Sequence, residues 1–128
     1  MTIRRQTLGK TGEDLAVGEL ERQGYAILAR RYRTRHGEID VVARDGETLV
    51  FVEVKARSSA AYGSGAEAVT PWKRRRLVSM ATDYLARYRC TGQACRFDVV
   101  AVDTGEERSS PRQAPGPRLT VYRNAFDA

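Results

Sequence analysis

One stretch of sequence, residues 37–55, decides the fold, and it reads GEIDVVARDGETLVFVEVK. Apolar β-branched residues dominate 38–43 and 48–56, which predicts two strands. Between them stands Asp45-Gly46, a strong signal for a tight turn. We therefore expect an antiparallel hairpin in which these two strands lie side by side.

Charged side chains interrupt this apolar hairpin. Side chains two residues apart in a strand share a face, so Glu53 and Lys55 lie together, and Asp40 shares its face with Glu38. Asp40 stands five residues before Asp45, and Glu53 stands seven after the following glycine, so a bulge or a small register shift is expected to bring the two carboxylates level. Charges in such strands are costly to bury unless they are paired or bound to metal.

Two neighbouring carboxylates repel each other, and a divalent cation relieves that repulsion. Mg²⁺ prefers oxygen ligands and keeps several waters, one of which can become the hydroxide that attacks a phosphodiester. Lys55 would orient this water or stabilise the developing negative charge. Ordinary ion pairs on a sheet use the same residue types, so the pattern alone leaves both interpretations open.

A helix is predicted before the hairpin, over residues 10–23. Its apolar side chains recur on one face, and Glu13 falls on that face, where a carboxylate is unexpected. Gly24 is expected to end the helix. Glu13 thereby becomes a further candidate for the site on the sheet.

A second helix is predicted over 71–89, because Thr70-Pro71 makes a good N-cap and first position. Its apolar face is expected to comprise Leu77, Met80, Ala81, Tyr84, Leu85 and Tyr88. Lys73 precedes Leu77 by one turn and is expected to point toward the sheet. Trp72 is expected to anchor the helix against the core; the alternative is that it stacks on a nucleobase.

The remaining sequence predicts further strands over 25–32 and 96–102, an edge strand over 118–123, a mobile loop over 58–69 and a flexible excursion over 104–117. The 128 residues are thus expected to form a single α/β domain over 1–128, with its core at about 8–102. The order is helix, three strands, helix, and one or two strands.

Composition and charge narrow the class of partner. The net charge is +6, and basic residues gather in two clusters, one comprising Arg30, Arg31, Arg33, Arg35 and His36 and the other Lys73 to Arg76. Such clusters neutralise phosphates or simply face solvent, and both interpretations stand. No apolar run reaches membrane-spanning length, and no signal peptide is expected, so the cytoplasm is the expected location. Cys90 and Cys95 are expected to be ordinary thiols.

The pattern Asp40…Glu53-Val54-Lys55 resembles the core motif of the PD-(D/E)xK nuclease superfamily. The chain more closely resembles the YraN-like family of small bacterial proteins over roughly residues 8–102. That likeness is carried by Gly9, Gly12-Glu13, Ala16, Leu20, Gly24-Tyr25, Gly37-Glu38-Ile39-Asp40, Phe51-Val52-Glu53-Val54-Lys55, Arg57, Ala68-Val69-Thr70-Pro71 and Lys73.

The resemblance implies a restriction-endonuclease-like αβββαβ core, with a mixed central sheet flanked by helices, related to archaeal Holliday-junction resolvases. It implies that Asp40 and Glu53 bind Mg²⁺ (or Mn²⁺) together with the Val54 carbonyl, and that Lys55 assists the attacking water. It further implies that Glu13 completes the metal site and that Lys73 contacts phosphate.

Around this core, Arg57, Arg33 and Arg35 are candidates for nucleic-acid contact, with a solvated role as the alternative for Arg57. Glu38 is expected to support the metal ligands, with a surface charge as the alternative. The function predicted is a Mg²⁺-dependent DNA endonuclease, with selectivity for branched DNA as in junction resolvases and with a homodimer as the expected assembly; no small-molecule cofactor and no membrane partner are expected. The alternatives are a non-catalytic nucleic-acid-binding protein that retains the nuclease fold and an interaction domain that binds no nucleic acid.

Overall fold

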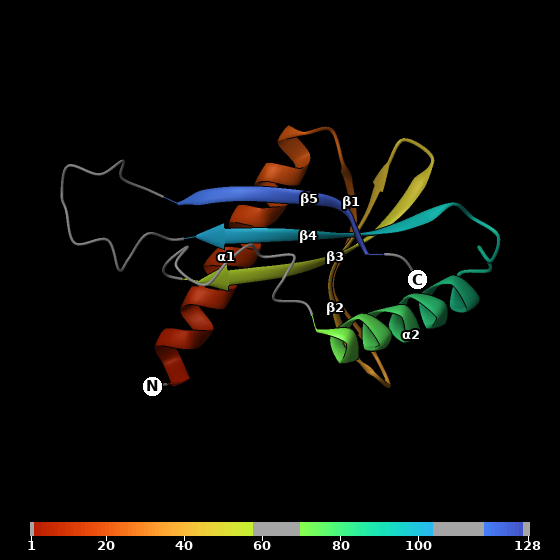
Figure 1. Ribbon diagram of the computed structural model, residues 1–128, viewed down its shortest axis with the longest axis horizontal. Helices are drawn as coiled ribbons and strands as arrows, with labels where there is room; N and C mark the ends of the chain where they lie inside the picture. Colours follow the sequence, from red (N-terminus) through yellow and green to blue (C-terminus); the bar gives the residue numbers. More distant parts are fainter. Residues whose placement is uncertain (1, 58–69, 104–116, 127–128) are drawn as a thin grey trace.

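The computed structural model describes residues 2–57, 70–103 and 117–126. Its elements follow the order α1, β1, β2, β3, α2, β4, β5, with the bounds α1 Thr2–Arg22, β1 Ala26–Thr34, β2 Gly37–Asp45, β3 Thr48–Arg57, α2 Pro71–Arg87, β4 Cys95–Asp103 and β5 Arg118–Phe126 (Figure 1). The fold is therefore α/β, with the αβββαβ order predicted from the sequence and one further strand.

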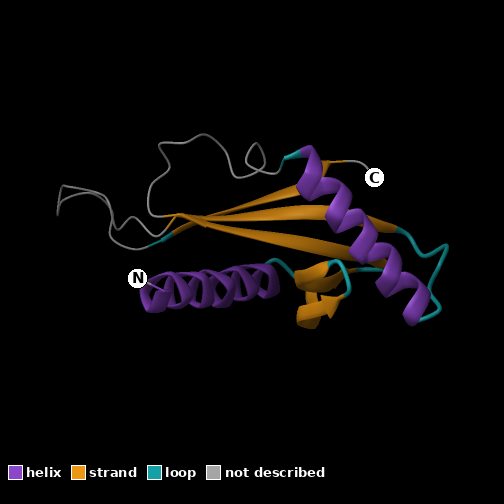
Figure 2. Cartoon of the chain, turned by 90° about the horizontal axis from the view of Figure 1, so that it is seen from below, coloured by secondary structure: helices purple, strands orange, loops and turns teal. Residues whose placement is uncertain are grey.

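The five strands form one mixed sheet in the order β1-β2-β3-β4-β5. Neighbouring strands are antiparallel except β3 and β4, which run parallel, with Glu53 opposite Val99 and Lys55 opposite Ala101. The parallel pair requires a crossover between β3 and β4, and this crossover contains α2. Each face of the sheet is covered by one helix (Figure 2).

Two apolar layers explain why the helices lie on opposite faces. On one face α1 packs Ala16, Val17 and Leu20 against valines of the central strands. On the other face α2 packs its buried residues Leu77, Met80, Ala81 and Tyr84 against Phe51, Phe97 and their neighbours. Residues 49–52 of β3 are all apolar and all buried, as expected for a strand that is covered on both faces.

The helix ends follow the predicted chemistry. Gly24 has a φ of 97°, and the backbone N–H groups of Gly24 and Tyr25 donate to the carbonyls of Glu21 and Leu20, which closes α1. The Thr70 side chain accepts a hydrogen bond from the Lys73 N–H at 3.2 Å, and Pro71 occupies the first turn of α2.

The β2–β3 hairpin differs from the prediction in one respect. Its two-residue loop is Gly46-Glu47, because Asp45 pairs with Thr48, whereas the sequence suggested Asp45-Gly46 as the turn. The ladder runs without a shift as far as Val41 opposite Val52, and beyond it the Asp40 side chain accepts a hydrogen bond from the Val54 N–H. Of the two expected possibilities, a bulge or a small register shift, the structure has the register shift: the loop begins one residue later, and the two carboxylates lie close together.

Other expectations also need correction. Helix α1 begins at Thr2, not near residue 10, because neither Gly9 nor Gly12 interrupts it. Tyr88 lies beyond α2 and is 53% exposed, and Trp72 is 59% exposed, so neither anchors the helix in the core. The loop predicted at 58–69, and all but the last residue of the excursion predicted at 104–117, lie outside the described residues. Neither described helix combines the length and apolar character needed to cross a membrane.

Candidate metal and phosphate site

The centre of the candidate site is the carboxylate pair Asp40 and Glu53, on the adjacent strands β2 and β3. Both side chains are partly buried and point to the face covered by α2. The Asp40 Oδ2 accepts a hydrogen bond from the backbone N–H of Val54 at 2.8 Å. This bond holds the Asp40 carboxylate across β3, next to Glu53.

The two carboxyl groups strongly affect each other's ionisation. Burial, and then the charge of Glu53, raise the pKa of Asp40 to about 7, although the Val54 N–H lowers it. Burial also raises the pKa of Glu53, while the charges of Lys73 and Lys55 lower it. The two carboxyl groups thus share a hydrogen bond, and ionising both of them at once is unfavourable.

Basic residues surround this pair from two elements. Lys55 follows on β3, and Lys73 and Arg76 lie in the first turns of α2. The positive charges of all three lower the pKa of Glu53. Asp40, Glu53, Lys73 and Arg76 line an open pocket of about 250 Å³, with Glu38, Leu77 and Met80 completing its wall. The pocket therefore combines paired carboxylates at its base with cations at its rim.

Arg76 belongs to this site, although the sequence predicted it only as part of the basic cluster Lys73 to Arg76. Its Nε donates to the His36 carbonyl at 2.7 Å, which ties α2 to the β1–β2 turn. A Cβ at Gly37, whose φ is 130°, would overlap the Arg76 guanidinium. Spacing was the missed signal, because Arg76 is one helical turn beyond Lys73 and shares its face.

Glu13 is buried on the inner face of α1, as predicted, but it is engaged in ion pairs. Its carboxylate accepts from the Nε of Arg30 at 3.1 Å and from the Nε of Arg31 at 2.8 Å. Its charge contributes to the raised pKa of Asp40, so the two groups are near each other. Glu13 does not line the pocket. Its role as a third metal ligand stays a prediction.

The other predicted nucleic-acid contacts lie outside the pocket. Arg33 is 81% exposed and forms an ion pair with Glu38 at 2.8 Å. Glu38 itself lines the pocket. Arg35 is 3.8 Å from Asp83 of α2. The side chain of Arg57 lies outside the described residues, although its backbone pairs with Asp103 at the end of β3. Contact of these three arginines with nucleic acid stays a prediction.

The donors present suit Mg²⁺ better than a transition metal. Mg²⁺ is usually held by one or two carboxylates, with waters and substrate phosphate filling its remaining positions. Asp40 and Glu53 supply two carboxylates, and a divalent cation between them would relieve the repulsion that contributes to the raised pKa of Asp40. No cluster of three or more histidine, cysteine or acidic residues suited to a metal occurs within residues 2–57, 70–103 and 117–126.

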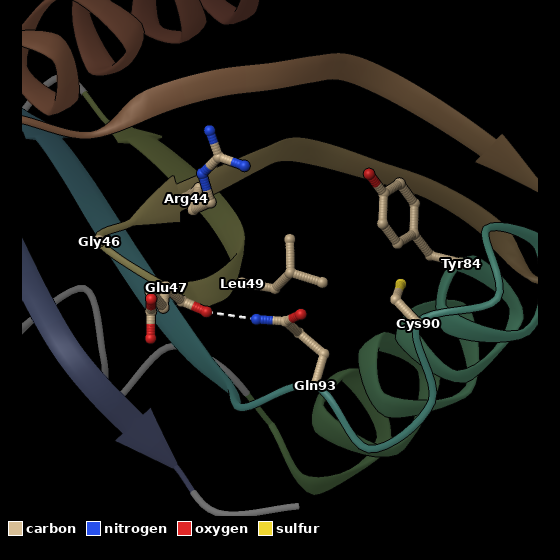
Figure 3. Close-up of a pocket in the computed structure, with 7 residues that line it drawn as sticks. All are labelled: Arg44, Gly46, Glu47, Leu49, Tyr84, Cys90 and Gln93. Atoms are coloured by element: carbon tan, nitrogen blue, oxygen red, sulfur yellow. Dashed lines mark hydrogen bonds between the residues drawn. The ribbon is translucent and has the colours of Figure 1, made fainter.

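A second, larger pocket of about 560 Å³ lies at the other end of the β2–β3 hairpin (Figure 3). Its wall includes Arg44, Leu49, Tyr84 and Cys90, and the Gln93 side-chain amide donates to the Glu47 carbonyl across its mouth. Glu47 is the sole carboxylate among the described residues that line it. It lacks the paired acidic groups of the first pocket.

The five-stranded mixed sheet between two helices, with acidic residues on adjacent central strands, defines an α/β protein with a restriction-endonuclease-like core. Residues 12–102 match the uncharacterised protein family UPF0102, and the chain belongs to that family. This is the YraN-like family that the sequence resembles.

Individual relatives match over nearly the whole chain. A UPF0102 protein of Geobacter metallireducens is 49% identical over 127 residues, covering 99% of this chain and 98% of the relative. Another, of Symbiobacterium thermophilum, is 50% identical over 121 residues, covering 94% and 97%. A third, of Anaeromyxobacter dehalogenans, is 48% identical over 123 residues, covering 96% and 86%. The family thus extends across the helices, the sheet and the pocket described above.

Proposed function

We propose that this protein is a Mg²⁺-dependent DNA endonuclease that hydrolyses phosphodiester bonds at the Asp40–Glu53 pocket. One observation carries the proposal: two partly buried carboxylates on adjacent strands lie close enough to affect each other's ionisation, and Lys55, two residues after Glu53, acts on the same group. A purely structural ion-pair cluster would not need two acidic groups in contact, since their repulsion destabilises the fold.

Each residue of the pocket has a distinct role in this proposal. Asp40 and Glu53, with the Val54 carbonyl, would hold Mg²⁺, which when bound lowers the pKa of a water and neutralises charge on the phosphate. The Lys55 ammonium orients that water and stabilises negative charge as it develops. Lys73 and Arg76 at the rim bind the flanking phosphate oxygens and so position the substrate.

Selectivity for branched DNA, as in junction resolvases, belongs to the same proposal. An open pocket at the surface of a small domain accommodates a backbone that bends away from it, and the exposed basic residues beside it add phosphate contacts. Two cuts at a junction need two such pockets, so the proposed active form is a two-fold homodimer.

The direct test is cleavage of labelled four-way junctions and linear duplexes by the purified protein with Mg²⁺ or Mn²⁺. We expect cleavage that is lost in Asp40→Asn and Glu53→Gln and retained in Glu47→Gln. Glu47 is a matched control because it lies in the turn of the same hairpin, away from the acidic pair. Failure of the wild-type protein to cut any of these substrates with either metal would refute the proposal.

One observation favours the alternative of a nucleic-acid-binding protein that does not cut. Glu13, the expected third acidic ligand, is already paired with Arg30 and Arg31. Under this alternative Asp40→Asn and Glu53→Gln bind DNA at least as tightly as the wild type, because they remove negative charge from the site, and no variant shows turnover. Salt-dependent binding without cleavage would therefore distinguish the two functions.

A further inference from the structure

A large aromatic side chain lies exposed beside the acidic pocket. Trp72, in the first turn of α2, is 59% exposed, whereas most large apolar residues of the described chain are buried. It is next in sequence to Lys73, a rim residue of the acidic pocket. Exposing an indole costs hydrophobic free energy, so its position calls for an explanation other than packing.

The indole is backed by a fixed guanidinium. The Cζ of Arg76 lies over the Trp72 ring, 5.4 Å from its centroid. The hydrogen bond from Arg76 Nε to the His36 carbonyl fixes the plane of that guanidinium, and Gly37 leaves room for it. Trp72 is therefore one layer of a stack that is anchored through Arg76 to the β1–β2 turn.

Trp72 also lines an open cavity of about 570 Å³, together with His36, Arg75, Arg76 and Ser79. The described lining contains an aromatic ring, two guanidinium groups, an imidazole and a hydroxyl, and no carboxylate. This chemistry suits a flat aromatic ligand that carries negative charge.

Arg76 connects this cavity with the acidic pocket, because it lines both. A phosphodiester held by Lys73 and Arg76 would therefore lie between the acidic pair and the indole. The adjoining nucleotide of the same strand would reach the cavity. A base paired within a duplex is already stacked on its neighbours, so its face is not available to an indole. An unpaired base can turn outward and stack on the indole.

We propose that Trp72, with Arg75 and Arg76, forms a stacking platform for an unpaired nucleobase next to the acidic pocket. The inference rests on the proposed function for its role, which is to select nucleic acid with a single-stranded or unpaired segment at the site of cleavage. The platform does not distinguish one base from another, since every base presents a similar π-face.

The test uses Trp72 as its own reporter, because it is the only tryptophan in the chain. The full-length protein, in EDTA so that no cleavage occurs, is titrated with short oligo(dT), with an abasic oligonucleotide of equal length, and with blunt duplex. We expect oligo(dT) to quench the indole fluorescence saturably and the abasic strand to quench it little. Equal affinity and quenching for both strands would overturn the proposal, since phosphate contact alone would explain them.

Variants then separate the ring from the charge. With labelled oligo(dT), Trp72→Ala is expected to weaken binding about tenfold, and Trp72→Tyr to restore part of the loss. Tyr88→Ala is the matched control, because Tyr88 is another exposed aromatic residue at the opposite end of the same helix. Unchanged binding in a folded Trp72→Ala protein would overturn the platform. A fluorescence response to anionic lipid vesicles but not to oligo(dT) would overturn it in favour of a membrane surface.

The two proposals fail separately. Selective quenching by oligo(dT) in a protein that cuts no DNA would leave the platform standing and remove the endonuclease. Mg²⁺-dependent cleavage that is equal in wild type and Trp72→Ala, on substrates with and without unpaired bases, would leave the endonuclease and remove the platform.

Discussion

The Asp40 carboxylate accepts a hydrogen bond from the Val54 backbone N–H, with 2.8 Å between Oδ2 and N. The bond forms just beyond the last described pair of the β2–β3 ladder, Val41 opposite Val52. A side chain thus replaces a backbone acceptor at the point where the two strands part. The same bond directs the Asp40 carboxylate onto Glu53, so the geometry of the acidic pair is set by the hairpin and not by loops.

Stability in the absence of metal should depend on pH through Asp40. Its pKa is raised from 3.8 to about 7, so the folded protein retains a proton that the unfolded chain releases above about pH 4. The free energy of unfolding therefore falls as pH rises from 4 to 7, and above 7 the loss is complete. Asp40→Asn, which keeps an acceptor for Val54, is expected to stabilise the protein at pH 8 by on the order of 2 kcal/mol and to have little effect at pH 4.

Urea unfolding of both proteins in EDTA at pH 4, 6 and 8 measures this difference. Glu47→Gln is the matched control, because it removes a carboxylate from the same hairpin without touching the pair. A stability difference between wild type and Asp40→Asn that stays constant from pH 4 to 8 would contradict the raised pKa.

Divalent metal should stabilise the folded protein where the pair is ionised. At a Mg²⁺ concentration of ~100 times Kd, one folded-state site adds about 2.7 kcal/mol to the free energy of unfolding. The rise in Tm should be larger at pH 8 than at pH 5.5, because Asp40 must lose its proton before it can bind the cation. Thermal melts over a Mg²⁺ series give the affinity.

Carboxylate variants show which groups carry this metal effect. We expect the Tm shift to disappear in Glu53→Gln and to persist in Glu47→Gln. Glu13→Gln should weaken the affinity less than Glu53→Gln, because Glu13 is held by Arg30 and Arg31. An equal loss in both would assign Glu13 to the metal as a direct ligand.

The sequence predicted the αβββαβ order and the acidic pair because both depend on local signals. These signals are the runs of apolar residues in the strands, the Thr70-Pro71 cap and the glycine at position 24. Each of them acts within a few residues of the chain. The hairpin turn was placed one residue too early, because Asp45-Gly46 has strong turn propensity while the actual loop, Gly46-Glu47, is set by the pairing of Asp45 with Thr48. Register is a property of both strands, which propensity at one dipeptide does not determine.

Contacts between distant elements account for the other differences. Arg76 enters the site through the His36 carbonyl, 40 residues away, and no local pattern marks such a bond. Trp72 was expected in the core because of its hydrophobicity, but the first turn of α2 extends past the buried stripe that begins at Leu77. The partners of Glu13, Arg30 and Arg31, depend on how β1 passes α1, and Arg31 reaches Glu13 from a left-handed backbone conformation with φ of 52°.

A buried network on the α1 side should contribute strongly to stability. Asp98 is fully buried and accepts hydrogen bonds from the Tyr25 hydroxyl at 2.7 Å, the Asn124 N–H at 2.9 Å and the Arg96 Nε at 3.0 Å. Asp98→Ala would leave the mostly buried Arg96 without its main partner, so we expect a loss of about 3–5 kcal/mol. Tyr25→Phe removes one hydrogen bond and should cost about 1–2 kcal/mol.

Urea unfolding at pH 7 measures both losses. The exposed ion pair of Arg22 with Glu19 provides the control, since Arg22 is 71% exposed and Arg22→Ala should have only a small effect on stability. A loss in Asp98→Ala no larger than that in Arg22→Ala would contradict the assignment of this network as a stabilising centre.

Two glycines of α1 should respond in opposite directions to the same substitution. A Cβ at Gly18 would meet no atom within 4 Å, so Gly18→Ala should raise the free energy of unfolding by roughly 0.5–1 kcal/mol through helix propensity alone. A Cβ at Gly12 would lie 2.8 Å from the Ala56 Cβ on β3, closer than two carbons tolerate. Gly12→Ala should therefore lower the free energy of unfolding by about 1–3 kcal/mol, since α1 must move off the sheet.

The clash at Gly12 has a specific remedy that tests its cause. Ala56→Gly removes the opposing Cβ, so Gly12→Ala combined with Ala56→Gly should be more stable than the sum of the two single changes predicts. Chemical denaturation of the four proteins in this cycle measures the coupling. Additive losses would mean that the close approach of α1 to β3 does not limit residue 12. A positive coupling would establish that α1 is held against the strand that carries Glu53 and Lys55, because the contact at Ala56 directly follows Lys55.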